Sequence, residues 1–61
     1  MPNYLIQGRK EPIECGETIE AGMRRLGMHP DSYLFVVDGR PVPMDTVPHE
    51  DVKVLKVASG G

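Results

Sequence analysis

One segment of the chain has the apolar period of an amphipathic helix, and this single helix constrains the fold more than any other feature. In GETIEAGMRRLG, the residues Ile19, Met23 and Leu26 recur at the spacing i, i+4, i+7 and form one apolar stripe. Thr18 suits the N-cap, and Gly27 suits the left-handed position beyond the C-cap. A lone helix must bury its stripe against another element, and the rest of the chain offers only strand-like runs. We therefore predict a two-layer α+β domain with one sheet packed on one helix.

Two further residues refine this helix. Gly22 weakens it by roughly 1 kcal/mol relative to alanine, and we expect the missing side chain to let the helix lie close to the sheet. Met28 follows Gly27 and is expected to supply the apolar contact that often accompanies a glycine C-cap.

Short apolar runs flank the helix and predict the strands. They are NYLIQ (3–7), EPIEC (11–15), YLFVV (33–37), RPVP (40–43) and VKVLKV (52–57). Asp38–Gly39 predicts a tight hairpin, and the prolines of the second and fourth runs restrict those strands to sheet edges. The predicted order is ββαβββ. In the connection before the last strand, Met44 and Val47 are expected to cover the open end of the sheet.

The last strand indicates which side of the sheet is buried. Val52 and Val54 share one face, while Lys53 and Leu55 share the other. Because burying an unpaired lysine is prohibitive, we expect Val52 and Val54 under the helix and Leu55 exposed.

In the middle strand we expect the larger pair, Phe35 and Val37, to face the core. The alternate residues then join the exposed face of the last strand. Scattered exposed apolar residues are normal, whereas clustered ones more often mark a docking surface. The predicted docking patch consists of Val36, Leu55, Leu34 and Lys53.

The bulk composition narrows the class of protein. With 61 residues and one cysteine, the chain forms one domain without an intramolecular disulfide. Its net charge of −2 argues against a nucleic-acid surface. Neither a signal peptide nor an apolar run long enough to span a bilayer occurs. We expect a cytoplasmic protein that is monomeric when free.

The side chains offer little for catalysis or metal binding. Cys15 ends the second predicted strand, and a lone cysteine is more often a small buried hydrophobe than a nucleophile. His29 and His49 lie in proline-flanked loops, where we expect solvated turn residues rather than zinc ligands. The candidate carboxylates Asp31, Asp45, Glu50 and Asp51 are expected in turns or caps, and Lys10, Lys53 and Lys56 on the surface, where they remain possible attachment sites. We do not expect an enzyme.

Three strings together resemble the ubiquitin-like β-grasp proteins: the capped helix GETIEAGMRRLGM, the hairpin VVDGRPVP and the final VKVLKVASGG. The chain is most similar to the sulfur carriers of thiamine and molybdopterin biosynthesis (ThiS and MoaD) and to small prokaryotic modifiers. The resemblance implies a mixed sheet of four to five strands, a β-grasp domain over 1–57 and a flexible tail over 58–61. It also implies that the exposed sheet face binds an activating enzyme of the E1 type.

The resemblance further implies a role for the terminal residues. An E1-like enzyme uses ATP and Mg²⁺ to adenylate the carboxylate of Gly61, while Gly60, Ser59 and Ala58 thread into its narrow channel. A carboxylate is a poor electrophile, so it needs a leaving group, and glycine leaves room for close approach because it lacks Cβ.

Three functions remain open from the sequence. In a sulfur carrier, the activated carboxylate becomes a thiocarboxylate for thiamine, molybdopterin or tRNA thiolation, with a synthase or thiolase as the partner that receives sulfur. In a protein modifier, it is joined to lysines of target proteins. In a non-covalent binding module, the tail plays no part. The sulfur carrier is our principal prediction.

Overall fold

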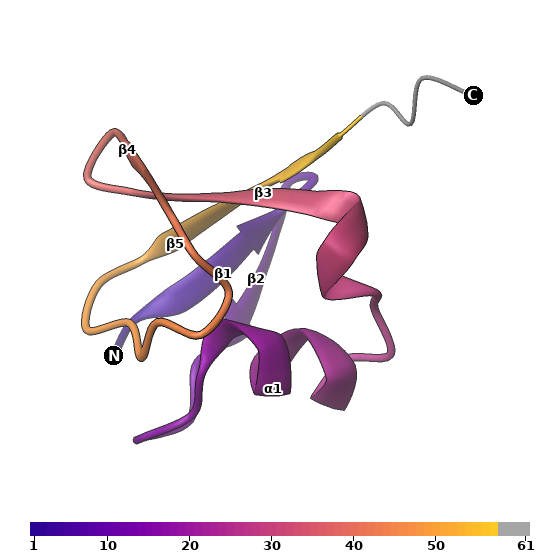
Figure 1. The fold of residues 1–61 in the computed structure, drawn as a ribbon. Coiled ribbons are helices and arrows are strands. Elements are labelled where there is room, and N and C mark those ends of the chain that lie inside the picture. Colours follow the sequence, from indigo (N-terminus) through magenta and orange to yellow (C-terminus); the bar gives the residue numbers. More distant parts are fainter. Residues whose placement is uncertain (58–61) are drawn as a thin grey trace.

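The computed structural model describes residues 1–57, and Figure 1 shows a sheet with one helix against one of its faces. The elements are β1 (Asn3–Ile6), β2 (Arg9–Pro12), α1 (Ile19–Arg25), the 3-10 helix η1 (Pro30–Ser32), β3 (Tyr33–Val37), β4 (Arg40–Val42) and β5 (Val52–Lys56). The strands form one five-stranded sheet in the order β2-β1-β5-β3-β4. β1 and β5 are parallel at its centre, and the other neighbours are antiparallel, so the sheet is mixed.

The predicted α+β architecture is confirmed. The order departs from the predicted ββαβββ by one element, η1, which lies between α1 and β3. Pro30 begins η1 and is buried, and its fixed φ suits the first position of a helical turn.

The predicted position of the second strand is wrong. We expected residues 11–15, but β2 spans Arg9–Pro12. Gln7 (φ 47°) and Gly8 (φ 82°) both have positive φ and form a two-residue turn that matches the twist of a hairpin. Pairing therefore begins at once with Ile6 opposite Arg9. Cys15 consequently lies outside the strand.

The second hairpin is as predicted. Asp38 (φ 53°) and Gly39 (φ 76°) form the turn between β3 and β4. β4 is an edge strand, where Pro41 is tolerated because one side of the strand needs no hydrogen-bond donor.

Both ends of α1 are capped by the residues that the sequence indicates. The Thr18 hydroxyl accepts a hydrogen bond from the backbone N–H of Ala21 at 3.1 Å. At the other end the N–H of Gly27 donates to Arg24 O at 3.0 Å, and the N–H of Met28 donates to Met23 O at 2.8 Å. With Gly27 at φ 76°, this pair of bonds is a Schellman motif.

The core lies between α1 and the sheet. Its buried side chains are Tyr4, Ile6, Ile13, Ile19, Met23, Phe35, Val52 and Val54. The predicted burial of Phe35, Val52 and Val54 is confirmed, while Val37 is only half-buried. Met44 packs against the core as expected, but Val47 is exposed.

At Gly22 the helix lies close against the sheet, as predicted. A Cβ at this position would lie 2.0 Å from the Tyr4 hydroxyl oxygen and 2.6 Å from the Tyr4 ring carbon that bears it. The hydroxyl donates to Glu17 Oε2 at 3.0 Å. Burial and this hydrogen bond raise the pKa of Tyr4.

The Glu17 carboxylate also binds Arg25, whose Nε and Nη2 each donate at 3.0 Å. Arg25 Nη2 donates in addition to the carbonyl oxygen of Pro12 at 2.9 Å. The hydrogen bonds from Arg25 hold the pKa of Glu17 below its usual range. This polar cluster ties α1 to β1 and β2 and so fixes the helix on one face of the sheet.

Candidate functional site

The sheet face away from α1 has no covering element among residues 1–57 (Figure 1). We call it the open face. Side-chain alternation and strand register assign to it Asn3, Leu5, Lys10, Pro12, Leu34, Val36, Pro41, Lys53 and Leu55. Most of these side chains are apolar, although they lie on the solvent side of the sheet.

The predicted docking patch lies together on two neighbouring strands of this face. Leu34 pairs directly with Leu55, and Val36 pairs with Lys53, across β3 and β5. Leu34 is 45% exposed and Leu55 43% exposed. Directly opposed side chains in an antiparallel pair are about 4.5–5.5 Å apart at Cβ. The patch is therefore one contiguous apolar surface with a lysine at its edge.

Two apolar residues extend this patch beyond the prediction. Leu5 pairs with Lys53 from the other side of β5 and is half-buried. Val57 is 48% exposed and directly follows β5, where its N–H donates to Ser32 O at 3.0 Å. Alternation along 53, 55 and 57 was a signal for Val57 in the sequence. The sequence contains no comparable signal for Leu5, because its place beside Lys53 depends on β1 pairing with β5.

The predicted activation site, Gly61, lies outside the described residues, as do the threading residues Gly60, Ser59 and Ala58. Their covalent connection nevertheless sets a limit. Four residues span at most about 14 Å even when fully extended. An enzyme that acts on Gly61 must therefore approach within about that distance of Val57, which lies beside the exposed Leu34–Leu55 pair.

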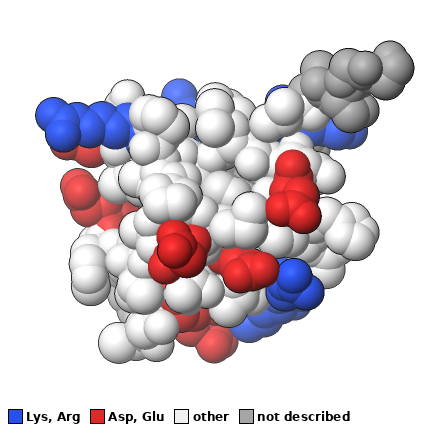
Figure 2. Space-filling model, viewed as in Figure 1, with Lys and Arg blue, Asp and Glu red and all other residues white. Residues whose placement is uncertain are grey.

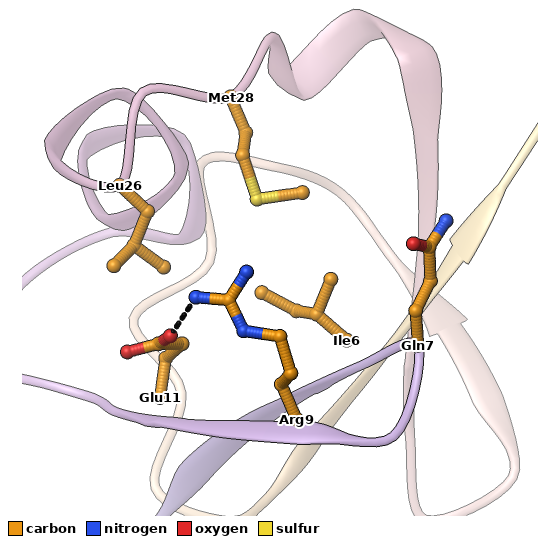
Figure 3. Close-up of a pocket in the computed structure, with 6 residues that line it drawn as sticks. All are labelled: Ile6, Gln7, Arg9, Glu11, Leu26 and Met28. Atoms are coloured by element: carbon orange, nitrogen blue, oxygen red, sulfur yellow. Dashed lines mark hydrogen bonds and ion pairs between the residues drawn. The ribbon is translucent and has the colours of Figure 1, made fainter.

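A small hollow of about 170 Å³ lies between β2 and the end of α1 (Figure 3). Its lining residues are Ile6, Gln7, Arg9, Glu11, Leu26 and Met28. Figure 3 shows the Arg9 guanidinium near its centre, paired with the Glu11 carboxylate. Because the charges of Arg9 and Glu11 neutralise each other and Arg9 fills much of the space, this hollow is a poor ligand site.

A larger groove of about 380 Å³ lies at the end of the sheet where β1 and β5 begin. Its lining residues are Met1, Pro2, Ile13, Glu14, Cys15, Gly16, Val47, Pro48 and His49. Cys15 is exposed here, so its predicted burial is wrong. The reason is that β2 ends at Pro12, which leaves Cys15 in a solvent-facing connection.

The comparison with protein families decides the kind of protein. The sequence model of the small archaeal modifier protein 2 (SAMP2) family matches residues 8–58, which is most of the chain. The chain belongs to this family. Neither the curated proteins nor the solved structures gave a match.

SAMP2 proteins are ubiquitin-like modifiers with a β-grasp fold, which confirms the resemblance and the fold class predicted from the sequence. The family as a whole is not a family of catalytic enzymes. Membership implies an E1-like enzyme and target proteins as partners in general.

Other classes of site find little support in this SAMP2 protein. Within residues 1–57, no group of three or more His, Cys, Asp or Glu side chains is placed so that it could hold a metal ion. His29 and His49 are both exposed, as expected for turn residues. In the same part of the chain, the single helix is far too short to cross a bilayer.

Proposed function

We propose that an E1-like enzyme docks on the open face of this modifier and adenylates the carboxylate of Gly61. The observation that carries the proposal is the exposed Leu34–Leu55 pair, which lies at the end of the sheet where β5 leads toward the tail. Such an apolar cluster on a small domain is typical of an interaction site. Family membership supports the same class of partner.

The short distance between the docking surface and the tail would help the enzyme to bind the tail. A short tether that loses its conformational freedom on binding contributes an entropic cost, so affinity must come from the folded domain. The patch supplies that affinity close to the reacting group. Once the domain is bound, the limited reach of the four tail residues raises the effective concentration of the carboxylate at the ATP site.

The first chemical step is common to both covalent functions. A carboxylate oxygen of Gly61 attacks the α-phosphorus of ATP bound with Mg²⁺ by the enzyme, and pyrophosphate leaves. The product is a mixed anhydride of Gly61 and AMP. AMP is a good leaving group, so the carbonyl carbon becomes open to nucleophiles.

Two nucleophiles complete the reaction in different ways. A lysine amine of a target protein forms an amide, and AMP and a proton leave; the description of the family as modifiers supports this outcome. Hydrosulfide forms a thiocarboxylate with loss of AMP and a proton, which is the sulfur-carrier function predicted from the sequence. Both need ATP, which fits the expected cytoplasmic location.

The test uses the full chain with the E1-like enzyme encoded by the same organism, Mg²⁺ and ATP. We expect ATP–pyrophosphate exchange that depends on the chain. With sulfide present, a sulfur carrier shows an intact-mass gain of one sulfur-for-oxygen exchange. With cell protein present, a modifier leaves the tryptic remnant Val57–Gly61 on target lysines, because trypsin cleaves after Lys56. Deletion of Gly60 and Gly61 abolishes every one of these products, and a function that survives the deletion identifies a non-covalent module instead.

A further inference from the structure

The charges of the chain are distributed unevenly between the open face and the remaining surface. Among the strand residues of the open face, Lys10 and Lys53 are basic and none is acidic. Of the nine acidic side chains, Asp51 directly precedes β5 in the alternation of Lys53 and Leu55 and so lies at the end of the open face. The other eight are Glu11, Glu14, Glu17, Glu20, Asp31, Asp38, Asp45 and Glu50. The open face is therefore locally positive on a protein whose net charge is −2.

The surface outside the open face is correspondingly negative. Because Lys10 and Lys53 are two of the seven basic side chains and Asp51 is one of the nine acidic ones, the remaining surface carries five basic and eight acidic side chains. In the view of Figure 2, acidic side chains are spread over the visible surface, and basic ones lie toward its corners. This separation of charge gives the domain an electrostatic orientation, since the positive face turns toward a negative partner before contact.

The two lysines are also available for a partner. Both are exposed, and neither takes part in the ion pairs found among residues 1–57. Lys53 lies between Leu5 on β1 and Val36 on β3, while Lys10 lies beyond Leu5 on the edge strand β2. Lys53 thus lies among the apolar residues of the patch, and Lys10 lies at its border.

We infer that the open face docks onto an enzyme surface that is apolar at its centre and carries carboxylates opposite Lys53 and Lys10. This inference rests on the proposed function and adds the chemistry by which the activating enzyme recognises the domain. Charge complementarity around an apolar centre governs partner choice and association rate more than final affinity. Two lysines on an apolar sheet are too few for a nucleic-acid surface, which requires an extended basic patch.

The test compares charge reversals on the two faces of the sheet. Lys53→Glu and Lys10→Glu place a negative charge on the open face. Lys56→Glu is the matched control, because Lys56 is exposed on the same strand but alternates to the other face. For each variant, kcat/KM of pyrophosphate exchange is measured with the E1-like enzyme at low and high salt. Circular dichroism and urea unfolding establish that the fold is retained.

We expect Lys53→Glu to lower kcat/KM about tenfold at low salt and Lys10→Glu to lower it less, because Lys10 is farther from the patch. The defect should shrink near 1 M salt, where the screening length is about 3 Å. Lys56→Glu should stay within about twofold of the unmodified chain, as is usual for an exposed charge outside an interface. Equal effects of Lys53→Glu and Lys56→Glu overturn the inference but leave the proposed function standing.

A second measurement does not depend on activation. A carbodiimide joins lysine amines directly to carboxylates in contact with them, so the chain and the E1-like enzyme are coupled and the linked peptides are mapped. Links from Lys53 or Lys10 to enzyme carboxylates support the inference, whether or not pyrophosphate exchange occurs. If such links form but exchange is absent, only the proposed function is refuted. Absence of both links and exchange refutes both.

Discussion

The substitution Gly22→Ala tests the close contact that places α1 on the sheet. In an exposed helix interior this change normally stabilises a protein by about 1 kcal/mol, because alanine restricts the unfolded chain and favours the helix. Here the new methyl carbon would lie 2.0 Å from the Tyr4 hydroxyl oxygen and 2.8 Å from Glu17 Oε2. The Tyr4 ring is fully buried, so it has little space into which to move.

The expected magnitude follows from opposing contributions. Overpacking a core costs about 1–3 kcal/mol, and losing a hydrogen bond to a charged group costs about 1.5–3 kcal/mol. The gain in helix propensity offsets about 1 kcal/mol of this. The net loss is about 1.5–5 kcal/mol, against a total stability of roughly 3–9 kcal/mol for a domain of this length.

Urea unfolding followed by circular dichroism measures this loss. Ala21→Gly is the matched control, because Ala21 is exposed in the same helix and should lose only about 1 kcal/mol of propensity. In a Tyr4→Phe background, the penalty of Gly22→Ala should be smaller, since the nearest atom is gone. If Gly22→Ala raised the urea midpoint, as it does in ordinary helices, the reasoning about this contact would be refuted.

Three further predictions concern the docking patch, the core and the polar cluster. Leu55→Glu should leave the unfolding midpoint nearly unchanged and lower kcat/KM of pyrophosphate exchange at least tenfold; cooperative unfolding at room temperature would show that Leu55 belongs to the core. Phe35→Ala should destabilise the domain by about 3–5 kcal/mol in urea, and a loss below 1 kcal/mol would contradict its burial. Because Arg25 lowers the pKa of Glu17, the stabilisation by its carboxylate is present above the ordinary glutamate value of about 4.3 and is lost as the pH falls through the lower folded-state pKa. The chain and its Glu17→Gln variant should therefore differ in urea midpoint at neutral pH and converge in acid, and a constant difference would contradict the ion pair.

Local signals in the sequence predicted the local structure well. Thr18, Gly27 and the Asp38–Gly39 pair each favour one backbone conformation through nearby atoms, and the structure has each of these conformations. The start of the second strand was misplaced because the turn has only two residues and includes Gln7 at positive φ, which is uncommon for a residue other than glycine, asparagine or aspartate. The error shifted β2 by about half its length and misplaced Cys15.

Non-local pairing limited what the sequence revealed about the site. Alternation divided each strand into two faces, and the cost of burying Lys53 and the larger size of the Phe35 pair assigned Leu34, Val36, Lys53 and Leu55 to the exposed one. It did not show that Leu34 lies directly opposite Leu55, or that Leu5 adjoins Lys53, since these contacts follow from the β1-β5-β3 order. The uneven distribution of charge between the two faces likewise became visible only after the strand register had assigned every strand residue to a face of the sheet.

Pyrophosphate exchange by the full chain and by its Gly60–Gly61 deletion, each with the E1-like enzyme, tests the central claim most directly. We predict exchange with the full chain, none with the deletion, and tight competitive inhibition by the deletion variant because its open face is intact. Equal exchange with both chains, or none with either, would contradict activation of the Gly61 carboxylate.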